Sequence, residues 1–459
     1  MPDHRWNPYL TGTIIIYGDY LYMMKTAMTI AGVDPGGGAG IAADLKTFAA
    51  LGVHGTCIIT SVTAPNTQGV LNSFDIPTGF IKEQFDAVVS DIKIDCAKTG
   101  MLSSPEIVRA VAGLVKRERL PLVIDPVMAA EAGGTLLENE AVDVLIEELL
   151  PLSAVITPNV PEAQRLSGMK INDISDACKA ARIISEFGAR AVIVTGGHLK
   201  GTDILYSNGE FTQIKGILIK GGTHGSGCTH SAVITADLSK GMALVEAARH
   251  AKEFVEQSIA LSFKIGKGAA PVNQTGHTLA DARRFGVIKN IEAALDLIKN
   301  SQGFTDLIPE VGCNIAMGIP DASSISDVAA VSGRIVRLKN EPHAVGCVAF
   351  GASSHVARIV LTVIQYDGKM RAAMNIRYSE GAIDACKDLG FCIASFRRED
   401  EPEGVSTMEW GVSDAIQREG KVPDVIFDKG GIGKEAMIRL IGREALEVAG
   451  KAAKIASSL

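Results

Sequence analysis

The feature that most constrains the fold is a repeated pattern: a short apolar run ends in an acid or a glycine turn, and a helical pattern follows. Residues 122–124 run directly into Asp125, and residues 155–156 lead through a Thr-Pro-Asn turn to Glu162. Residues 27–33 likewise end in the glycine turn 34–40, before helical periodicity over 41–51. Units of this kind build parallel sheets that bind ligands at the carboxyl ends of their strands. The pattern predicts a doubly wound α/β domain over residues 24–275.

Length and composition narrow the class. A chain of 459 residues exceeds one ordinary core, which favours two domains. Its 47% hydrophobic content with 5% aromatics and 48 glycines favours parallel sheets with tight loops. A net charge of −7 argues against nucleic acid as a partner, and no apolar run is long enough to span a membrane. Eight scattered cysteines predict reduced thiols and a cytoplasmic location. Residues 1–23 are expected to be an extension without fixed structure.

One glycine-rich stretch, residues 221–230, leads into an apolar helical run. Its backbone N–H groups at Gly225, Ser226 and Gly227 can gather around an oxyanion at the positive end of the helix. Cys228 falls in the first helical turn, where the helix dipole is expected to lower the thiol pKa and favour a thiolate that serves as a base or proton relay. The alternative is a glycine-rich loop with a buried, inert cysteine.

Acidic residues follow two strands. Asp125 and Glu162 are expected to point into one crevice and to hold Mg²⁺ directly or through water. Glu162, at the start of a helix, can also merely complement the helix dipole. Asp44 is expected in the first turn of the helix over 41–51, facing the same space.

Residues 266–276 are rich in glycine and turns, and they predict the domain boundary. A helix is expected over 282–300, followed by a second, smaller α/β domain with strands at 334–338 and 345–350. Residues 425–435 predict a strand, a glycine loop and a helix.

Two groups of residues in this second half can bind an anion. Ser353 or Ser354 is expected to cap the helix over 355–365, and the same helix start, with His355 at its mouth, also suits a phosphate. Asn375 and Arg377 lie in a cluster that either clamps an anion or is a charged surface run.

Six motifs come in order along the first half: residues 30–41 (IAGVDPGGGAGI), 43–48 (ADLKTF), 98–102 (KTGML), 125–128 (DPVM), 157–162 (TPNVPE) and the loop 223–229. Together they resemble the hydroxymethylpyrimidine and phosphomethylpyrimidine kinases of thiamine synthesis, which have the ribokinase-like fold. The resemblance implies ATP-dependent phosphorylation of the pyrimidine alcohol and then of its monophosphate, on an anion hole of Gly225, Ser226, Gly227 and Cys228.

The resemblance also implies binding residues. The pyrimidine site would be lined by Gly32, Asp44, Met101 and Val127. Mg²⁺ and ATP would be served by Asp125, Asn159, Glu162, Thr195 and Thr223. The chain departs from the family twice, with Pro65 in place of a common glutamine and Thr195 in place of a common lysine. Proline has no side-chain donor for the pyrimidine, so a pyridoxal-type kinase is an alternative.

In the second half, residues 309–315 (PEVGCNI), 333–337 (GRIVR), 350–358 (FGASSHVAR), 374–378 (MNIRY) and 428–430 (DKG) resemble the archaeal-type thiamine-phosphate synthase domain. Over residues 276–459, the resemblance implies coupling of the pyrimidine diphosphate with a thiazole phosphate. Arg334 and His355 would supply positive charge to the departing diphosphate, with Arg377 behind them and Ser353, Ser354 and Asn375 binding substrate. A module that senses thiamine phosphates without turnover is the alternative. A homo-oligomer, a dimer in the simplest case, is expected.

Overall fold

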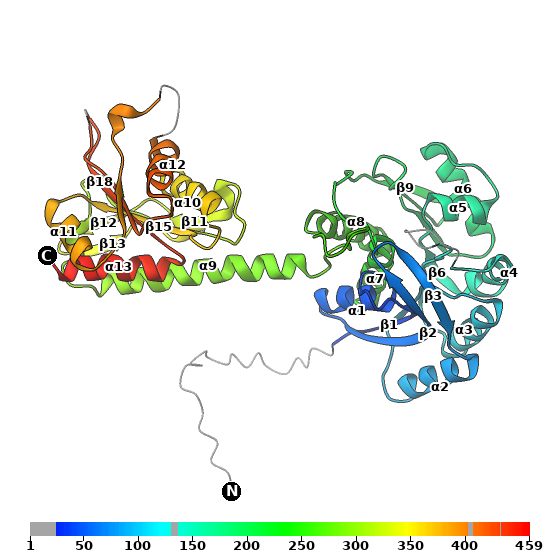
Figure 1. Ribbon diagram of the computed structural model, residues 1–459. Coiled ribbons are helices and arrows are strands. Elements are labelled where there is room, and N and C mark those ends of the chain that lie inside the picture. Colours follow the sequence, from blue (N-terminus) through cyan, green and yellow to red (C-terminus); the bar gives the residue numbers. More distant parts are fainter. Residues whose placement is uncertain (1–23, 130–135, 403–406, 432) are drawn as a thin grey trace, which may run out of the picture. The chain divides into compact units, whose positions relative to one another are not determined.

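The computed structural model describes residues 24–129, 136–402, 407–431 and 433–459, and the expected extension at 1–23 lies outside them. The chain divides into two compact units, the first ending at Thr278 and the second beginning at Leu279 (Figure 1). The division falls within the first turn of α9 (Gly276–Lys299), close to the boundary that the glycine-rich segment predicts.

The first unit is built on a nine-stranded sheet that is parallel from β2 to β7. The antiparallel strands β3, β8 and β9 extend its two edges. In spatial order the strands are β3 (Gly69–Asp75), β2 (His54–Asn66), β1 (Thr26–Val33), β4 (Cys96–Thr99), β5 (Leu122–Ile124), β6 (Ser153–Ile156), β7 (Ala191–Val194), β8 (Asp203–Ser207) and β9 (Glu210–Ile214). The predicted doubly wound architecture is confirmed.

Helices cover both faces of this sheet. Alternation along the strands places Met28 and Ile30 on one face and Ala27 on the other, because successive side chains of a strand point to opposite sides. The first face packs against α2 (Thr78–Val89), α3 (Pro105–Glu118), α4 (Asn139–Val144), α5 (Val160–Ser167) and α6 (Ile174–Glu186). The second packs against α1 (Gly40–Ala50), α7 (Ser226–Ser239) and α8 (Leu244–Ala260).

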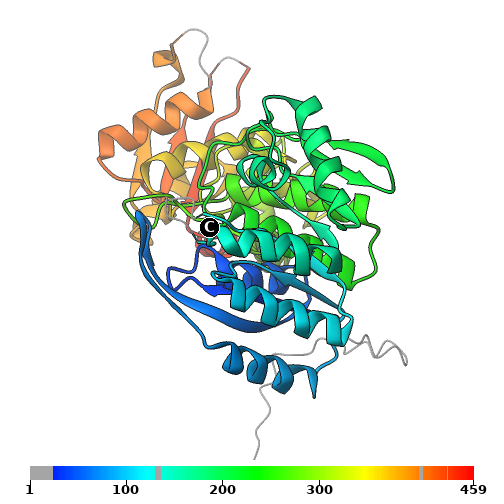
Figure 2. The same ribbon diagram turned by 90° about the vertical axis from the view of Figure 1, so that its right-hand side faces the viewer.

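Pro65, one of the two departures from the family, lies in a strand. β2 continues to Asn66, and β3 begins at Gly69 and pairs with it antiparallel. The two strands form a long ribbon at the edge of the sheet, drawn in blue (Figure 2). Because β3 leaves its side chains exposed, including Leu71 and Phe74, its sequence lacks the apolar alternation that marks a half-buried strand.

The second unit has a seven-stranded sheet, mostly antiparallel, and a separate hairpin of β12 (Ile335–Leu338) and β13 (Glu341–Ala344). In spatial order the main sheet has β14 (Val348–Phe350), β11 (Val328–Val331), β10 (Ile315–Gly318), β15 (Ala372–Arg377), β18 (Met437–Gly442), β17 (Val425–Asp428) and β16 (Ile393–Ser395). The helix expected near residue 435 is wrong. The chain turns back there as β18, antiparallel to β17, and satisfies the backbone hydrogen bonds within the sheet.

Two helix layers enclose this sheet as well. On one face the core contains residues of α9, α11 (Glu380–Asp388) and α13 (Ala445–Ser457). On the other face it contains residues of α10 (Ser354–Tyr366) and α12 (Thr407–Glu419). Among the described helices of both units, none combines the length and the apolar character needed to cross a membrane.

Candidate active sites

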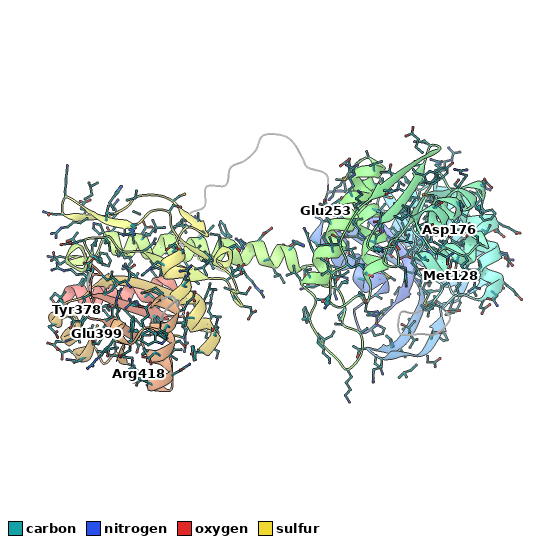
Figure 3. All side chains as sticks on the ribbon, turned by 90° about the horizontal axis from the view of Figure 1, so that it is seen from above. Met128, Asp176, Glu253, Tyr378, Glu399 and Arg418 are labelled. Atoms are coloured by element: carbon teal, nitrogen blue, oxygen red, sulfur yellow. The ribbon has the colours of Figure 1, made fainter. Side chains whose placement is uncertain are left out.

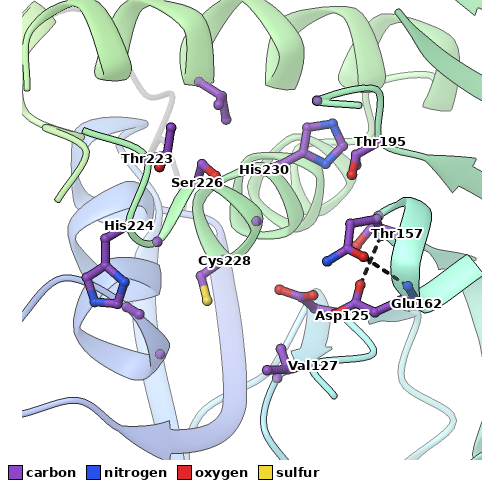
Figure 4. Close-up of a pocket in the computed structure, with 18 of the residues that line it drawn as sticks. Asp125, Val127, Thr157, Glu162, Thr195, Thr223, His224, Ser226, Cys228 and His230 are labelled. Atoms are coloured by element: carbon purple, nitrogen blue, oxygen red, sulfur yellow. Dashed lines mark hydrogen bonds between the residues drawn. The ribbon is translucent and has the colours of Figure 1, made fainter. Parts of the chain in front are cut away.

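The first unit holds a cavity of about 590 Å³ at the carboxyl ends of its parallel strands (Figure 4). Every residue that the sequence placed near the pyrimidine or the nucleotide of this unit lies in its wall. These residues are Gly32, Asp44, Met101, Asp125, Val127, Asn159, Glu162, Thr195, Thr223, Gly225, Ser226, Gly227 and Cys228. Motifs far apart along the chain therefore meet in one place. Most of them end a parallel strand or begin the helix that follows one, whereas Gly225–Cys228 begin α7 after the antiparallel strand β9.

Two glycine loops touch at this cavity. Gly225 is the N-cap of α7 with a φ of +82°, and a β-carbon on it would lie 1.9 Å from the carbonyl oxygen of Gly38. A β-carbon on Gly38 would in turn lie 2.3 Å from the ring of His224. Only glycine allows this approach. The loop after β1 is thus packed against the backbone amides that open α7.

Asp34, at the end of β1, organises the first of these loops. Its Oδ2 accepts hydrogen bonds from the N–H groups of Gly38 and Ala39 at 2.9 and 2.8 Å, and it lies 3.3 Å from Nε2 of His224. Burial alone would raise the pKa of this carboxyl, but the hydrogen bonds from His224 and the amides hold it below its usual value. An ionised Asp34 therefore ties the loop after β1 to the anion-binding loop.

Asp125 and Glu162 face the cavity together. Glu162 forms a capping box with Asn159: the N–H of Asn159 donates to Oε2 of Glu162, and the N–H of Glu162 donates to Oδ1 of Asn159, both at 2.9 Å (Figure 4). Glu162 thus caps its helix and also lines the cavity. Burial and the charge of Asp125 raise the pKa of Glu162 to about 8. Two buried carboxyl groups that raise each other's proton affinity favour a bound cation.

Asp44 lies in the second turn of α1, so its predicted place in the first turn is wrong. It is fully buried, and its Oδ1 lies 2.7 Å from Nζ of Lys98, while Thr29 donates to its Oδ2 at 2.6 Å. Lys98 is also fully buried, 3.9 Å from Oδ2 of Asp125. Burial would lower the pKa of Lys98, but the charges of Asp44 and Asp125 raise it, so the ammonium persists. The ammonium group of Lys98 thus links Asp44 and Asp125.

The expectation of a Cys228 thiolate is wrong. Cys228 does lie in the first turn of α7, but burial and the negative charge of Asp125 raise its thiol pKa to about 12. Burial, together with the repulsion from the neighbouring carboxylates, outweighs the effect of the helix dipole on the thiol pKa. In the free protein Cys228 is a neutral thiol and does not act as a base.

Sequence reasoning missed several residues of this cavity. The motif 98–102 contains Lys98 but predicts no role for it, although a lysine inside an apolar strand is itself a signal of a buried charge with a partner. His230, Asp203 and Lys252 were not considered as site residues. The apolar part of the wall was missed as well and consists of Ile217, Leu218, Ile219, Val255 and Ile259.

In the second unit, polar residues gather on the sheet face that α10 and α12 cover. Ala373 on β15 and Ile441 on β18 belong to the core beneath these helices. Because strand side chains alternate, Asn375 and Arg439 lie on the same face, one step along each strand. Apolar packing therefore gives way to polar side chains along these strands.

Asp428 is the centre of this polar group. Its Oδ1 and Oδ2 accept hydrogen bonds from Nε and Nη2 of Arg398 at 2.6 and 3.1 Å, and Oδ2 also accepts one from Arg439 at 2.7 Å. Asp428 and Arg439 are buried, whereas 13% of the Arg398 side chain is exposed. Burial would raise the pKa of Asp428, but the two guanidinium groups lower it. Sequence reasoning missed both arginines.

His355, in the first turn of α10, lies near these arginines. The His355 side chain is exposed at the surface, but the protein around it still excludes part of the solvent. This partial desolvation, with the charges of Arg439, Arg398 and Arg334, lowers the pKa of His355 to about 4. Arg334 is near enough for its charge to act on the His355 imidazole, as expected if the two residues share a site. The expectation of a positively charged His355 is wrong for the free protein, because the arginines disfavour a further cation.

The remaining predicted residues of this unit have different surroundings. Ser353 is the N-cap of α10, but its side chain makes no capping hydrogen bond, and Ser354 begins the helix. Asn375 is buried and its Oδ1 accepts from the N–H of Asn314 at 2.9 Å, so it positions the turn that carries Gly312. Arg334 donates to the carbonyl of Val311 in the same turn. Arg377 is exposed at the end of β15.

Comparison with known proteins assigns both units. Residues 34–273 match the family described as phosphomethylpyrimidine kinase, and residues 290–454 match thiamine-phosphate synthase ThiN. The bifunctional thiamine biosynthesis protein ThiDN of Methanocaldococcus jannaschii is 39% identical over 429 residues, which cover 92% of this chain and 96% of that protein. The chain belongs to the bifunctional thiamine biosynthesis proteins.

Other relatives of this bifunctional protein cover the first unit alone. The hydroxymethylpyrimidine/phosphomethylpyrimidine kinase of Rhizobium meliloti is 44% identical over 258 residues, 55% of this chain and 97% of that protein. A pyridoxal kinase of Bacillus subtilis, solved as an ADP complex, is 39% identical with a TM-score of 0.53 and covers 56% of this chain and 99% of that one. The first unit has the expected ribokinase-like fold, and the protein is an enzyme with a kinase domain and a thiamine-phosphate synthase domain.

Proposed function

We propose that the first unit transfers phosphate from ATP to hydroxymethylpyrimidine and then to its monophosphate, and that the second unit couples the resulting diphosphate with a thiazole phosphate. The observation that carries the kinase assignment is the single cavity shared by the amides at the start of α7 and the acids Asp125 and Glu162. Phosphoryl transfer needs positioning and charge neutralisation above all, and this wall supplies both.

Mg²⁺ fits the acid pair. No group of three or more His, Cys, Asp or Glu side chains among the described residues is placed to hold a metal. Mg²⁺ ordinarily takes one or two carboxylates and completes its shell with water and substrate phosphates, which matches Asp125 and Glu162. The bound ion would neutralise charge on the phosphates. Ionisation of Glu162, whose pKa is about 8, would favour its binding.

The other parts of the cavity divide between the two substrates. The apolar residues Ile217, Val255 and Ile259 suit the base of the nucleotide, and Thr195 and Asn159 its phosphate side. Gly32, Met101 and Val127 would line the space for the pyrimidine. The ion pair of Asp44 and Lys98 is part of the same cavity wall. The alcohol oxygen attacks the terminal phosphorus and ADP leaves. Because bond making lags in such reactions, the alcohol proton can leave late, and a neutral Cys228 is compatible with the step.

In the second unit, departure of diphosphate from the pyrimidine methylene carbon would leave a cation that the thiazole nitrogen traps. Positive charge placed on the diphosphate favours this step. Arg334, which is exposed, would bind it. The neutral His355 would donate a hydrogen bond to it, or would take up a proton from solution when it binds. Ser353, Ser354 and Arg377 remain proposed substrate contacts.

We further propose a cytoplasmic homodimer with two independently folding domains. All eight cysteines are free, which suits a reducing compartment. The exposed apolar residues Leu71 and Phe74 on the edge strand β3 suit a second copy of the chain.

The full chain with ATP and Mg²⁺ tests these assignments. Hydroxymethylpyrimidine should yield its diphosphate, and addition of thiazole phosphate should yield thiamine phosphate and diphosphate. Pyridoxal, offered in parallel, should turn over more slowly. Faster turnover of pyridoxal would assign the pyridoxal-type kinase that Pro65 leaves open. Binding of both phosphorylated precursors without thiamine phosphate formation would make the second unit a sensor.

A further inference from the structure

His230, in the second turn of α7, is a buried side chain that the proposed mechanism does not use. The residue is 5% exposed. Nδ1 has no hydrogen-bond partner among the described residues, and Nε2 has only Oδ2 of Asp203 at 3.5 Å, which is too far for a well-formed hydrogen bond. Leaving such a group unpaired costs about 1–3 kcal/mol. Because His230 also lines the cavity, a ligand that enters the cavity can satisfy it.

Two neighbours place His230 on the nucleotide side. His230 lies four residues after Ser226, so both lie on the same face of α7, one turn from the anion-binding amides. Its Nε2 lies 3.5 Å from Oδ2 of Asp203, and Oδ1 of Asp203 accepts from the N–H of Gly196 at 2.7 Å. The imidazole is therefore next to the turn that begins at Thr195, as Figure 4 shows.

The acid next to His230, Asp203, is itself paired with a lysine. Asp203 is 1% exposed, and Nζ of Lys252 lies 3.1 Å from its Oδ1. Burial would raise the pKa of Asp203, but His230 and Lys252 lower it. A carboxylate that is already paired with a lysine can orient the imidazole through Nε2 without repelling a phosphate strongly. Thr195, across the same space, brings a hydroxyl but no charge.

We propose that His230, protonated on both ring nitrogens when the nucleotide is bound, keeps Nε2 toward Asp203 and donates a hydrogen bond from Nδ1 to the phosphate chain. This inference rests on the proposed kinase function. It makes His230 a nucleotide-binding residue that supplies positive character where Thr195 supplies none. The apolar residues Ile217 and Val255 remain available for the base.

Calorimetric titration of the full chain with Mg²⁺ and either ADP or adenosine tests the proposal. If the unmodified chain does not bind ADP, the kinase assignment itself fails. Given that binding, His230→Leu should weaken ADP by about tenfold or more, the loss of a hydrogen bond to a charged group, and leave adenosine unchanged. Adding Thr195→Lys to this variant should restore ADP binding, because a lysine there reaches the same phosphates.

The matched control is His250→Leu on α8. His250 also faces an aspartate, with Nδ1 2.6 Å from Oδ2 of Asp237, but it is not part of the cavity wall. The ADP affinity of the His250→Leu variant should equal that of the unmodified chain. If His230→Leu does not fold, as judged by circular dichroism, His230→Gln takes its place, with a smaller loss for ADP and none for adenosine. ADP binding at full strength in the folded variant, or equal losses for ADP and adenosine, overturns the proposal.

Discussion

Oδ2 of Asp34 lies 3.3 Å from Nε2 of His224, although 190 positions separate the two residues in the chain. Through this contact the loop after β1 and the loop before α7 hold each other in place. The backbone of Gly38 packs against Gly225 directly beneath it. The amides proposed to receive the transferred phosphoryl group therefore depend on a carboxylate from the opposite end of the kinase unit's sequence.

Asp34→Ala should lower kinase turnover by about 10- to 100-fold, because a small displacement of positioning groups is costly in phosphoryl transfer. Coupling by the second unit should be unchanged. Asp95→Ala is the matched control: Asp95 also accepts a backbone N–H, from Thr26 at 3.1 Å, but at the beginning of β1, away from the cavity. Steady-state kinetics of both reactions measure this. Equal kinase losses in the two variants would show that Asp34 acts only through stability.

Lys98→Met should destabilise the first unit by about 3–5 kcal/mol, because it leaves two buried carboxylates without their cation. Adding Asp44→Asn should recover part of this loss. Lys25→Met, which removes an exposed lysine 3.1 Å from Asp95, should cost about 0–1 kcal/mol. Urea unfolding gives these differences. A loss for Lys98→Met as small as that for Lys25→Met would contradict a buried, charged Lys98.

Glu162 should make the first unit less stable as pH rises between about 4.5 and about 8, the ordinary and the raised pKa of its carboxyl. In this window the unfolded chain has released the proton that the folded chain still holds, so the folded state loses its advantage. Glu162→Gln should make stability nearly independent of pH in this window. Mg²⁺ should have the same effect on the unmodified chain, but no further effect on the variant. Thermal unfolding with and without Mg²⁺ measures both effects. A profile unchanged by the substitution would contradict the raised pKa.

Cys228 should react slowly with iodoacetamide near neutral pH, because its thiol pKa is about 12 and only the thiolate is nucleophilic. Cys347, which is exposed, serves as the internal reference within the same molecule. Mass spectrometry of partially alkylated protein gives both rates. Cys228→Ser should keep kinase activity within about tenfold, since a hydroxyl also carries a proton at neutral pH. Rapid alkylation of Cys228 with loss of activity in the serine variant would restore the thiolate mechanism.

Binding of inorganic diphosphate to the second unit should take up a proton near neutral pH, because the anion offsets the arginines that lower the pKa of His355 to about 4. Calorimetry in buffers of different ionisation enthalpy detects this uptake. His355→Ala should remove it and abolish coupling, while ATP-dependent phosphorylation persists. Diphosphate binding without proton uptake would leave His355 neutral in the complex.

Arg398→Leu should also weaken diphosphate binding. It removes one of the two positive charges that are paired with Asp428 and act on His355, so less positive charge remains for the anion. Arg418→Ala is the control. Arg418 lies on α12, exposed and paired with Asp414, and is labelled in Figure 3. Equal affinities in the two variants would place Arg398 outside the site.

Much of the fold could be predicted from local patterns. Strands that end in Asp125 or before Glu162, and the glycine turn 34–40, predicted a parallel sheet with its site at the carboxyl ends. Local patterns failed where neighbours decide the structure. The β3 strand is stabilised by pairing with β2 at an edge, and β18 by pairing with β15 and β17, so neither carries a distinctive signal of its own.

The sequence by itself determined many of the groups that reach each site, although not Lys98, Arg398 or Arg439, since the strand ends and glycine loops are encoded within a few residues of each other. Only the tertiary structure decided their charge. Burial and the charge of Asp125 keep Cys228 a neutral thiol, and burial and the charges of Arg439 and Arg398 keep His355 a neutral imidazole. Proton affinity depends on burial and on charges brought close from distant segments, and these distances exist only in the folded chain.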